Sequence, residues 1–271
     1  MRTSLDASPW QWLGGADNET ATLVALTAIV IGFRSVLRRT VVRRRVFSRA
    51  VDCMAIGVNA AYVESLFGVP AFGTLNLSGA GQLVYVTPHG YVAVYFQSGR
   101  AEQFAFTVTD WRLRYRLKGP TFGVLSGRLG RAGTQAPSTP EGVFVSIGAR
   151  RVWCVETYYA GNPGGYLYYS LAYNDASGVG RFPPAVIASH HSSLATGIFT
   201  MYADPQSPPD SDALAMSVHR ELVPNTLIVS RSVEHLERQE FGVDLDEVRL
   251  LRRNPSLSDR YNWWRLRRRW R

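Results

Sequence analysis

Apolar residues are most concentrated near the start of the chain, where no charged residue occurs from Thr20 to Phe33. Counted on to Leu37, this segment has 18 residues. A helix of about 20 residues crosses a hydrocarbon core of about 30 Å, and the side chain of Arg34 can extend to the headgroups at one end. The pattern therefore predicts a transmembrane helix over residues 20–37.

Charges around this segment favour a membrane anchor over two alternatives. A cleaved signal peptide has its basic residues before the apolar run, whereas here acidic residues precede it and arginines follow it. A buried core helix would not accommodate those arginines easily. By the positive-inside rule we expect a single-pass protein of the bacterial inner membrane, with residues 1–19 outside and the rest cytoplasmic. The residues expected to contact the membrane are Trp10, Trp12, Leu23, Val24, Leu26, Ile29, Val30, Ile31, Phe33 and Arg34.

A second apolar pattern, with three- and four-residue spacing, follows the arginines. It runs from Phe47 to Leu66 and is typical of one face of an amphipathic helix. Gly68 suits the position just after a helix, and Pro70 prevents its continuation. The pattern therefore predicts one helix that ends before Gly68.

Alternating, strand-like segments come next, over residues 82–87, 91–97 and 102–110. Pro88-His89-Gly90 and Ser98-Gly99-Arg100 separate them at the spacing of β-hairpin turns. With the preceding helix, they predict a helix plus antiparallel β-meander over residues 38–116.

Glycine, proline, serine and threonine are frequent between residues 117 and 146, which we interpret as a linker or long loop. Residues 151–160 and 166–174 then predict two strands, and residues 226–230 a short one. They belong to a second β-containing unit over residues 147–255, before a tail of residues 256–271. The expected fold class is α+β, with one or two helix-plus-meander units after the membrane helix.

The net charge is +9, and it is concentrated toward both ends of the chain. Seven arginines lie between Arg34 and Arg49 and six between Arg260 and Arg271, while the middle is close to neutral. We expect the tail to contact anionic lipid, because tryptophan and arginine both favour the membrane interface. A solvated, disordered tail is the first alternative, and nucleic acid is the disfavoured partner. The tail residues proposed for surface binding are Trp263, Trp264, Arg267, Arg268 and Trp270.

No recognisable catalytic, phosphate-binding or metal-binding motif occurs, so we expect no cofactor and no metal. His190 and His191 are adjacent, a poor arrangement for chelating one ion from a strand. Tyrosines crowd the two strands at residues 151–174, and an aromatic binding surface there is the alternative to simple packing against the sheet. The tyrosines proposed for such a surface are Tyr158, Tyr166 and Tyr168.

Two sequence strings carry a family resemblance. Phe67-Gly-Val-Pro70 and Tyr158-Tyr-Ala-Gly-Asn-Pro-Gly-Gly-Tyr166 resemble an uncharacterised bacterial family with an N-terminal transmembrane helix and a soluble domain. Pro224-Asn225-Thr226 is a weaker match, and the resemblance covers roughly residues 20–230. It supports the membrane anchor and implies no catalytic residues.

These patterns leave two main classes of function open. The first is a membrane-anchored binding or sensing domain with an unknown ligand and protein partner. The second is a membrane-tethered enzyme whose site is built from scattered polar residues such as Glu156, Asp175 and His190. A cavity that brings Glu156 or Asp175 within hydrogen-bonding reach of a histidine would favour the enzyme. A nucleic-acid-binding effector acting through the tail is the third alternative.

Overall fold

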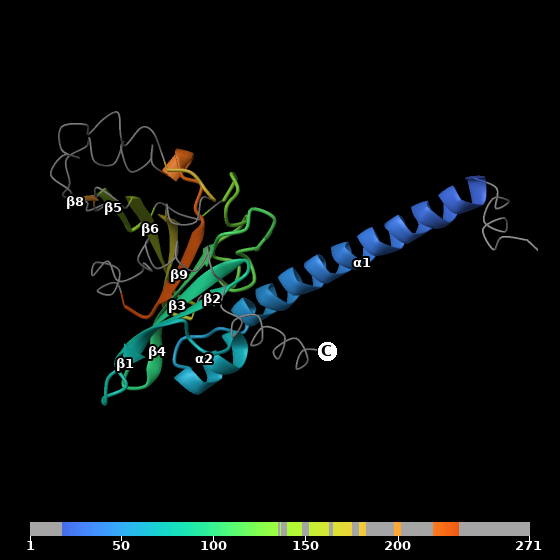
Figure 1. Cartoon of the computed structure of the whole chain (residues 1–271). Coiled ribbons are helices and arrows are strands. Elements are labelled where there is room, and N and C mark those ends of the chain that lie inside the picture. Colours follow the sequence, from blue (N-terminus) through green and yellow to red (C-terminus); the bar gives the residue numbers. More distant parts are fainter. Residues whose placement is uncertain are drawn as a thin grey trace, which may run out of the picture. The chain divides into compact units, whose positions relative to one another are not determined.

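The structure is a computed structural model of the whole chain, and Figure 1 shows its helices and strands. Two units are distinguished, Met1–Arg45 and Val46–Arg271, with the boundary inside the first helix. The residues that the structure describes are 18–134, 136, 140–147, 152–162, 165–174, 179–182, 198–201 and 219–232.

Helix α1 (Asn18–Asp52) is continuous and contains the segment predicted to span a membrane. Within the described residues, no helix is both long enough and apolar enough for such a span. The predicted transmembrane helix is therefore wrong, and with it the membrane-anchored fold class. The physical reason is length: the uncharged run from Ala21 to Phe33 covers about 20 Å at 1.5 Å per residue, against a hydrocarbon core of about 30 Å. Arg34 then begins the arginine-rich part of the helix.

The residues proposed for membrane contact fall into two groups. Trp10 and Trp12 lie outside the described residues, as do the side chains of Leu23, Val24 and Phe33. The other five residues proposed for membrane contact are exposed on α1; they are Leu26, Ile29, Val30, Ile31 and Arg34.

The single helix predicted from Phe47 to Leu66 is two helices in the structure. Helix α1 ends at Asp52, and α2 (Ala60–Phe67) begins after an interruption. Gly57 has a φ of 86°, which a helix does not allow, and the Asn59 side chain accepts a hydrogen bond from the backbone N–H of Tyr62 at 2.8 Å. That N-cap starts a new helix. The end was predicted correctly, because Gly68 is its C-cap, with a φ of 89°.

The second unit is built on one antiparallel sheet of nine strands in the order β1-β2-β3-β4-β9-β7-β6-β5-β8. Most of the predicted strands are confirmed; β5 lies largely in the segment interpreted as a linker or long loop, and the sequence patterns predict no strand at β1 or β8. The strands are β1 (Phe72–Leu75), β2 (Gly81–Thr87), β3 (Gly90–Gln97), β4 (Arg100–Val108), β5 (Gly142–Ile147), β6 (Val152–Ala160), β7 (Leu167–Asn174), β8 (Ile198–Met201) and β9 (Thr226–Ser230).

Strand β9 decides the architecture. It pairs with β4 on one side and with β7 on the other, so that Phe106 and Leu171 both lie opposite Leu227. All five of its residues are buried. The two expected helix-plus-meander units are thus one continuous sheet, and the predicted α+β architecture is corrected to a mainly antiparallel β structure with few helices. Nothing local in residues 226–230 indicates that two hairpins will be joined there.

The two faces of the sheet differ in side-chain size. The aromatic face carries large buried rings, including Tyr85, Phe96, Phe106, Tyr158 and Tyr169. The opposite face carries a smaller buried cluster, in which Tyr91 is the one fully buried ring among the residues described; the others are Val84, Ala93, Ala105, Val155, Ala172 and Ile228. On the aromatic face, Phe106 lies between Phe47 and Tyr115, with ring centroids 5.2 and 4.9 Å away. This face therefore holds the main core.

Strands β3 and β4 approach each other so closely at Gly90, the first residue of β3, that only glycine fits there. A Cβ atom there would lie 2.1 Å from the backbone carbonyl oxygen of Thr107 on β4. We expect Gly90→Ala to lower the free energy of unfolding by about 1–3 kcal/mol, the usual cost of overpacking. Urea denaturation would measure it. Gly99→Ala is a poor comparison because of its positive φ, so the control is Gly119→Ala, where the nearest atom is 4.0 Å away. Equal stability of the two variants would contradict the prediction.

Candidate functional site

Glu156 is a buried carboxylate in the middle of strand β6. Alternation along the strand places it on the aromatic face with Cys154 and Tyr158, while Val155 is on the opposite face. Its cross-strand neighbours are Val143 on β5 and Leu171 on β7. Glu156 is 1% exposed, so an acidic side chain lies among apolar neighbours. Such a position is costly unless polar partners are supplied.

Two polar side chains meet one oxygen of this carboxylate. The Tyr158 hydroxyl donates to Glu156 Oε2 at 2.9 Å, and Nδ1 of His219 lies 3.0 Å from the same oxygen. The Tyr158 hydroxyl and His219 Nδ1 are 3.2 Å apart. His219 comes from a short helical turn that precedes β9, 63 residues further along the chain. The three side chains form a compact cluster, the Glu156–Tyr158–His219 site.

Glu156 changes the protonation equilibria of its neighbours. The pKa of His219 is raised, first by its hydrogen bond to Glu156 and then by the negative charge of that group; burial and Arg220 oppose the rise. The pKa of Tyr158 is raised well above its usual range, by burial first and by Glu156 second. Tyr158 therefore remains a hydrogen-bond donor at any physiological pH. Burial, and then Glu156, also raises the pKa of Cys154, so this thiol is not an activated nucleophile.

The second oxygen of Glu156 is unusual. Glu156 Oε1 is buried and has no hydrogen-bond partner among the described residues. Unpartnered buried polar atoms are rare, since each loses its hydration without compensation. This unpaired oxygen adds to the free-energy cost of burying the carboxylate.

The site's geometry assigns different roles to the two histidine nitrogens. Nδ1 faces the buried carboxylate, which holds the proton on that nitrogen and leaves Nε2 as the basic position. The His219 side chain is 25% exposed, whereas the Glu156 side chain is 2% exposed. His219 is thus the member of the cluster that solvent reaches. A carboxylate-oriented imidazole on a partly exposed side chain can take a proton from water or from a hydroxyl group.

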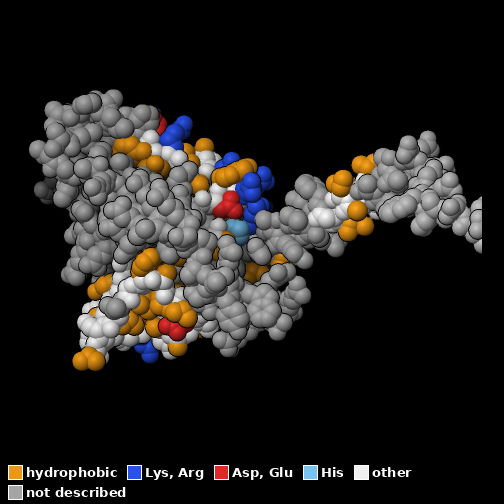
Figure 2. Space-filling model, viewed as in Figure 1, with side chains coloured by type: hydrophobic (Ala, Val, Ile, Leu, Met, Phe, Trp, Pro, Cys, Tyr) orange, Lys and Arg blue, Asp and Glu red, His pale blue; other side chains and the backbone are white. Residues whose placement is uncertain are grey.

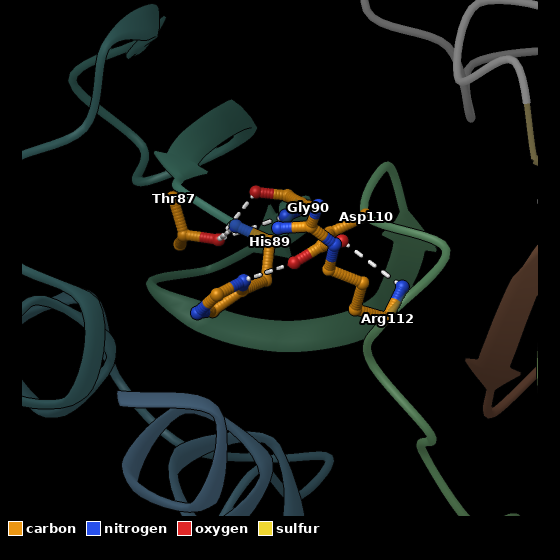
Figure 3. Close-up of polar contacts among 5 residues, drawn as sticks. All are labelled: Thr87, His89, Gly90, Asp110 and Arg112. Carbon is orange, nitrogen blue, oxygen red and sulfur yellow. Dashed lines mark hydrogen bonds and ion pairs between the residues drawn. The ribbon is translucent and has the colours of Figure 1, made fainter. Parts of the chain in front are cut away.

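A second histidine–carboxylate pair, His89–Asp110, provides a comparison. Nδ1 of His89 lies 2.9 Å from Asp110 Oδ2 in the turn between β2 and β3 (Figure 3). The backbone carbonyl of His89 also accepts from the N–H groups of Thr109 and Asp110. The His89 side chain is only 7% exposed, and its ring centroid lies 6.0 Å from that of Phe47. These bonds connect the β2–β3 turn to the residues that follow β4, so the role of the pair is structural.

The structure separates the tyrosines that were proposed as one surface. Tyr158 is buried in the site described above, whereas Tyr166 is 65% exposed in the turn before β7. Tyr168 is half-buried and contacts Tyr159, with ring centroids 5.1 Å apart. The tail residues Trp263, Trp264, Arg267, Arg268 and Trp270 lie outside the described residues.

Sequence reasoning identified one member of the site and missed its partner. Glu156 was named with Asp175 and His190, both of which lie outside the described residues. The structure brings Glu156 to His219 instead. No motif surrounds His219; the available signal was an acidic residue inside an otherwise apolar strand, which requires a partner. In the described part of the chain, no three histidine, cysteine or acidic side chains gather as metal ligands.

Comparisons with known proteins identify no relative from which a role could be transferred. No protein-family model matches the chain. Searches of curated proteins and of solved structures likewise find no significant match. The chemistry of the Glu156–Tyr158–His219 site must therefore be inferred from its geometry alone.

Proposed function

We propose that this protein is a hydrolytic enzyme in which His219 acts as the general base that activates water. The observation that carries the proposal is the pairing of a fully buried carboxylate, Glu156, with a partly exposed histidine at 3.0 Å. Groups poised for proton transfer near neutral pH are typical of catalytic sites.

Each residue of the site has a distinct role in this proposal. His219 Nε2 takes a proton from water as the water attacks the substrate, and the imidazolium then returns the proton to the leaving group. Glu156 is a positioning residue, because it fixes the tautomer of His219 and stabilises the imidazolium. Tyr158 donates to Glu156 Oε2 and holds the carboxylate in place.

The test is a turnover assay with a panel of p-nitrophenyl esters, phosphates and glycosides, followed by His219→Gln. Glutamine keeps similar size and polarity but cannot act as a base. We expect kcat to fall on the order of 10²- to 10⁴-fold for any substrate that is turned over, the usual contribution of general acid–base catalysis. KM should change little, because the lost interaction belongs to the transition state.

His89→Gln is the matched control. It removes a histidine that is also paired with a carboxylate through Nδ1, but one that is buried in a structural turn. We expect this variant to lose stability and retain kcat. Turnover by His219→Gln at the wild-type rate would overturn the proposal. The proposal is also overturned if a compound stabilises the protein against heat without being converted and no member of the panel is turned over. A binding or sensing domain would behave in that way.

A further inference from the structure

The segment after β4, residues 111–131, displays a row of cations on a rigid support. Side chains alternate in direction: Leu113, Tyr115 and Leu117 are buried. The residues between and after them are exposed; they are Arg112, Arg114, Arg116 and Lys118. Arg131 is also exposed and Arg128 is half-buried. Figure 2 shows basic side chains gathered at the position of this green segment of Figure 1. These six cations form what we call the basic loop.

The charge of the basic loop is not balanced within the segment itself, although Asp110 and Asp52 contact it through Arg112 N–H and Tyr115. Residues 111–131 contain six basic residues and no acidic residue. In the described part of the chain, ion pairs are formed by other residues, and none of these six takes part in one. The near-neutral charge of the middle of the chain is therefore an average that conceals a strongly positive segment.

Two of the cations are placed directly opposite each other. Arg116 and Arg128 form an antiparallel bridge, flanked by hydrogen bonds from Leu117 N–H to the Gly127 carbonyl and from Leu129 N–H to the Tyr115 carbonyl. Like charges facing each other across such a pair destabilise the fold. A bound anion between them would remove that repulsion.

The loop is held in shape from inside and at both ends. Thr121 is fully buried, and its hydroxyl bonds to the backbone of Leu117 and Leu125. At the start, Asp110 accepts from the backbone N–H of Arg112 (Figure 3), and at the end Gly130 N–H donates to the Pro224 carbonyl. The cations are therefore displayed without first ordering the backbone, which reduces the entropic cost of binding.

Two exposed aromatic rings accompany the cations. Trp111 is 62% exposed and Phe122 is 63% exposed. The guanidinium of Arg112 lies 5.3 Å from the centre of the Trp111 ring. Phe122 is at the turn of the loop with a φ of 51°, a conformation that non-glycine residues seldom adopt. Single-stranded nucleic acids offer two kinds of contact to such a surface. Their phosphates pair with arginine, and their unstacked bases stack on exposed aromatic rings.

We propose that the basic loop binds single-stranded nucleic acid, through phosphate contacts from Arg114, Arg116 and Arg128 and base stacking on Trp111 and Phe122. A duplex fits less well, because its bases are already stacked and unavailable to the two rings. This surface is independent of the Glu156–Tyr158–His219 site and does not rest on hydrolytic activity.

The experiment measures fluorescence anisotropy of a labelled oligothymidine titrated with the full-length protein at several salt concentrations. We expect the double variant Arg114→Glu/Arg116→Glu to raise Kd at least about tenfold. The slope of log K against log salt should fall by about 0.7 for each phosphate contact removed. Trp111→Ala should raise Kd several-fold and leave the slope unchanged, because stacking releases no counterions.

Two controls separate this surface from other basic parts of the chain. Arg100→Glu makes one of the same charge reversals at an exposed position outside the loop, and it should have little effect on Kd. Arg267→Glu/Arg268→Glu makes the same double charge reversal in the tail. The proposal is overturned if the tail variant abolishes binding while the loop variant does not. It is also overturned if vesicles of phosphatidylserine and phosphatidylcholine bind more tightly than the oligonucleotide, or if a duplex of equal length does.

Discussion

Replacing Asn225 with aspartate is expected to lower the free energy of unfolding by about 3–5 kcal/mol. Each lost hydrogen bond to a buried carbonyl costs about 1–3 kcal/mol, and the burial of a charge adds to this. Asn225 is fully buried immediately before β9. Its side-chain amide donates to the backbone carbonyls of Asn174 and Val179 at 2.5 and 2.6 Å. Its side-chain oxygen accepts from the N–H of Asn174 at 2.8 Å.

Aspartate has the same shape but lacks both N–H donors. Its carboxylate would face the backbone carbonyl oxygens of Asn174 and Val179, to which it has no proton to donate. Because β9 joins β4 to β7, disruption at Asn225, the residue just before β9, should affect the whole sheet. Urea denaturation of the wild type and the variant would measure the loss.

Asn76→Asp is the matched control for this prediction. Asn76 lies in an exposed turn, where its side-chain oxygen accepts from Ala80 N–H and from the Ser78 hydroxyl. Aspartate preserves both of those contacts, so we expect a change below about 0.5 kcal/mol, as for most surface substitutions. If both variants unfold at the same urea concentration as the wild type, Asn225 is not the connection inferred here.

Glu156→Gln is expected to have the largest effect on the proposed activity apart from loss of His219 itself. Glutamine can still accept the Nδ1 proton, but it has no charge to stabilise an imidazolium. We expect kcat to fall on the order of 10²- to 10⁴-fold, as when the orienting carboxylate of a catalytic histidine is replaced.

The pH dependence of this variant follows from the cause of the His219 shift. The pKa of His219 is raised chiefly by Glu156, so removal of the carboxylate lowers it. Only neutral His219 can act as a base; the acid limb of the kcat/KM profile should therefore move to lower pH in the variant. A raised folded-state pKa also means that the Glu156–His219 contact stabilises the protein fully below about pH 6.5, the unfolded value. That stabilisation is lost as pH rises through the folded-state pKa.

NMR titration of the His219 ring would measure the pKa without any substrate, and the activity profile would follow once a substrate is found. Glu102→Gln is the control, since Glu102 pairs with Arg231 rather than with a histidine. An unchanged His219 titration in Glu156→Gln would show that the contact does not govern this group.

Much of the secondary structure could be read directly from the sequence. Strand alternation and turn residues correctly predicted β2, β3, β4, β6, β7 and β9. Gly68 was correctly predicted as the end of a helix. These features depend on residues close together in the chain, whose backbone preferences act whatever the rest of the molecule does.

The errors arose where a local pattern supported more than one structure. The apolar run at residues 20–33 was read as the core of a membrane helix, but its uncharged length is insufficient for a span. The helical spacing of apolar residues from Phe47 to Leu66 continues across residues 53–59, although Gly57 and Asn59 interrupt the helix there. Glycine and proline between residues 117 and 146 concealed both the ordered basic loop and β5.

By itself, then, the sequence determined which short segments would be strands, where their turns would fall, and that Glu156 was an acidic residue in an apolar strand. Only the tertiary structure decided that β9 would lie between β4 and β7, that His219 would reach Glu156 across 63 residues, and that Arg116 would face Arg128. The physical reason is that the whole chain must bury the apolar faces of its sheet and pair the edges of its strands. These requirements fix the strand order and which distant side chains come into contact. Local preferences carry no information about which distant segment will supply the partner.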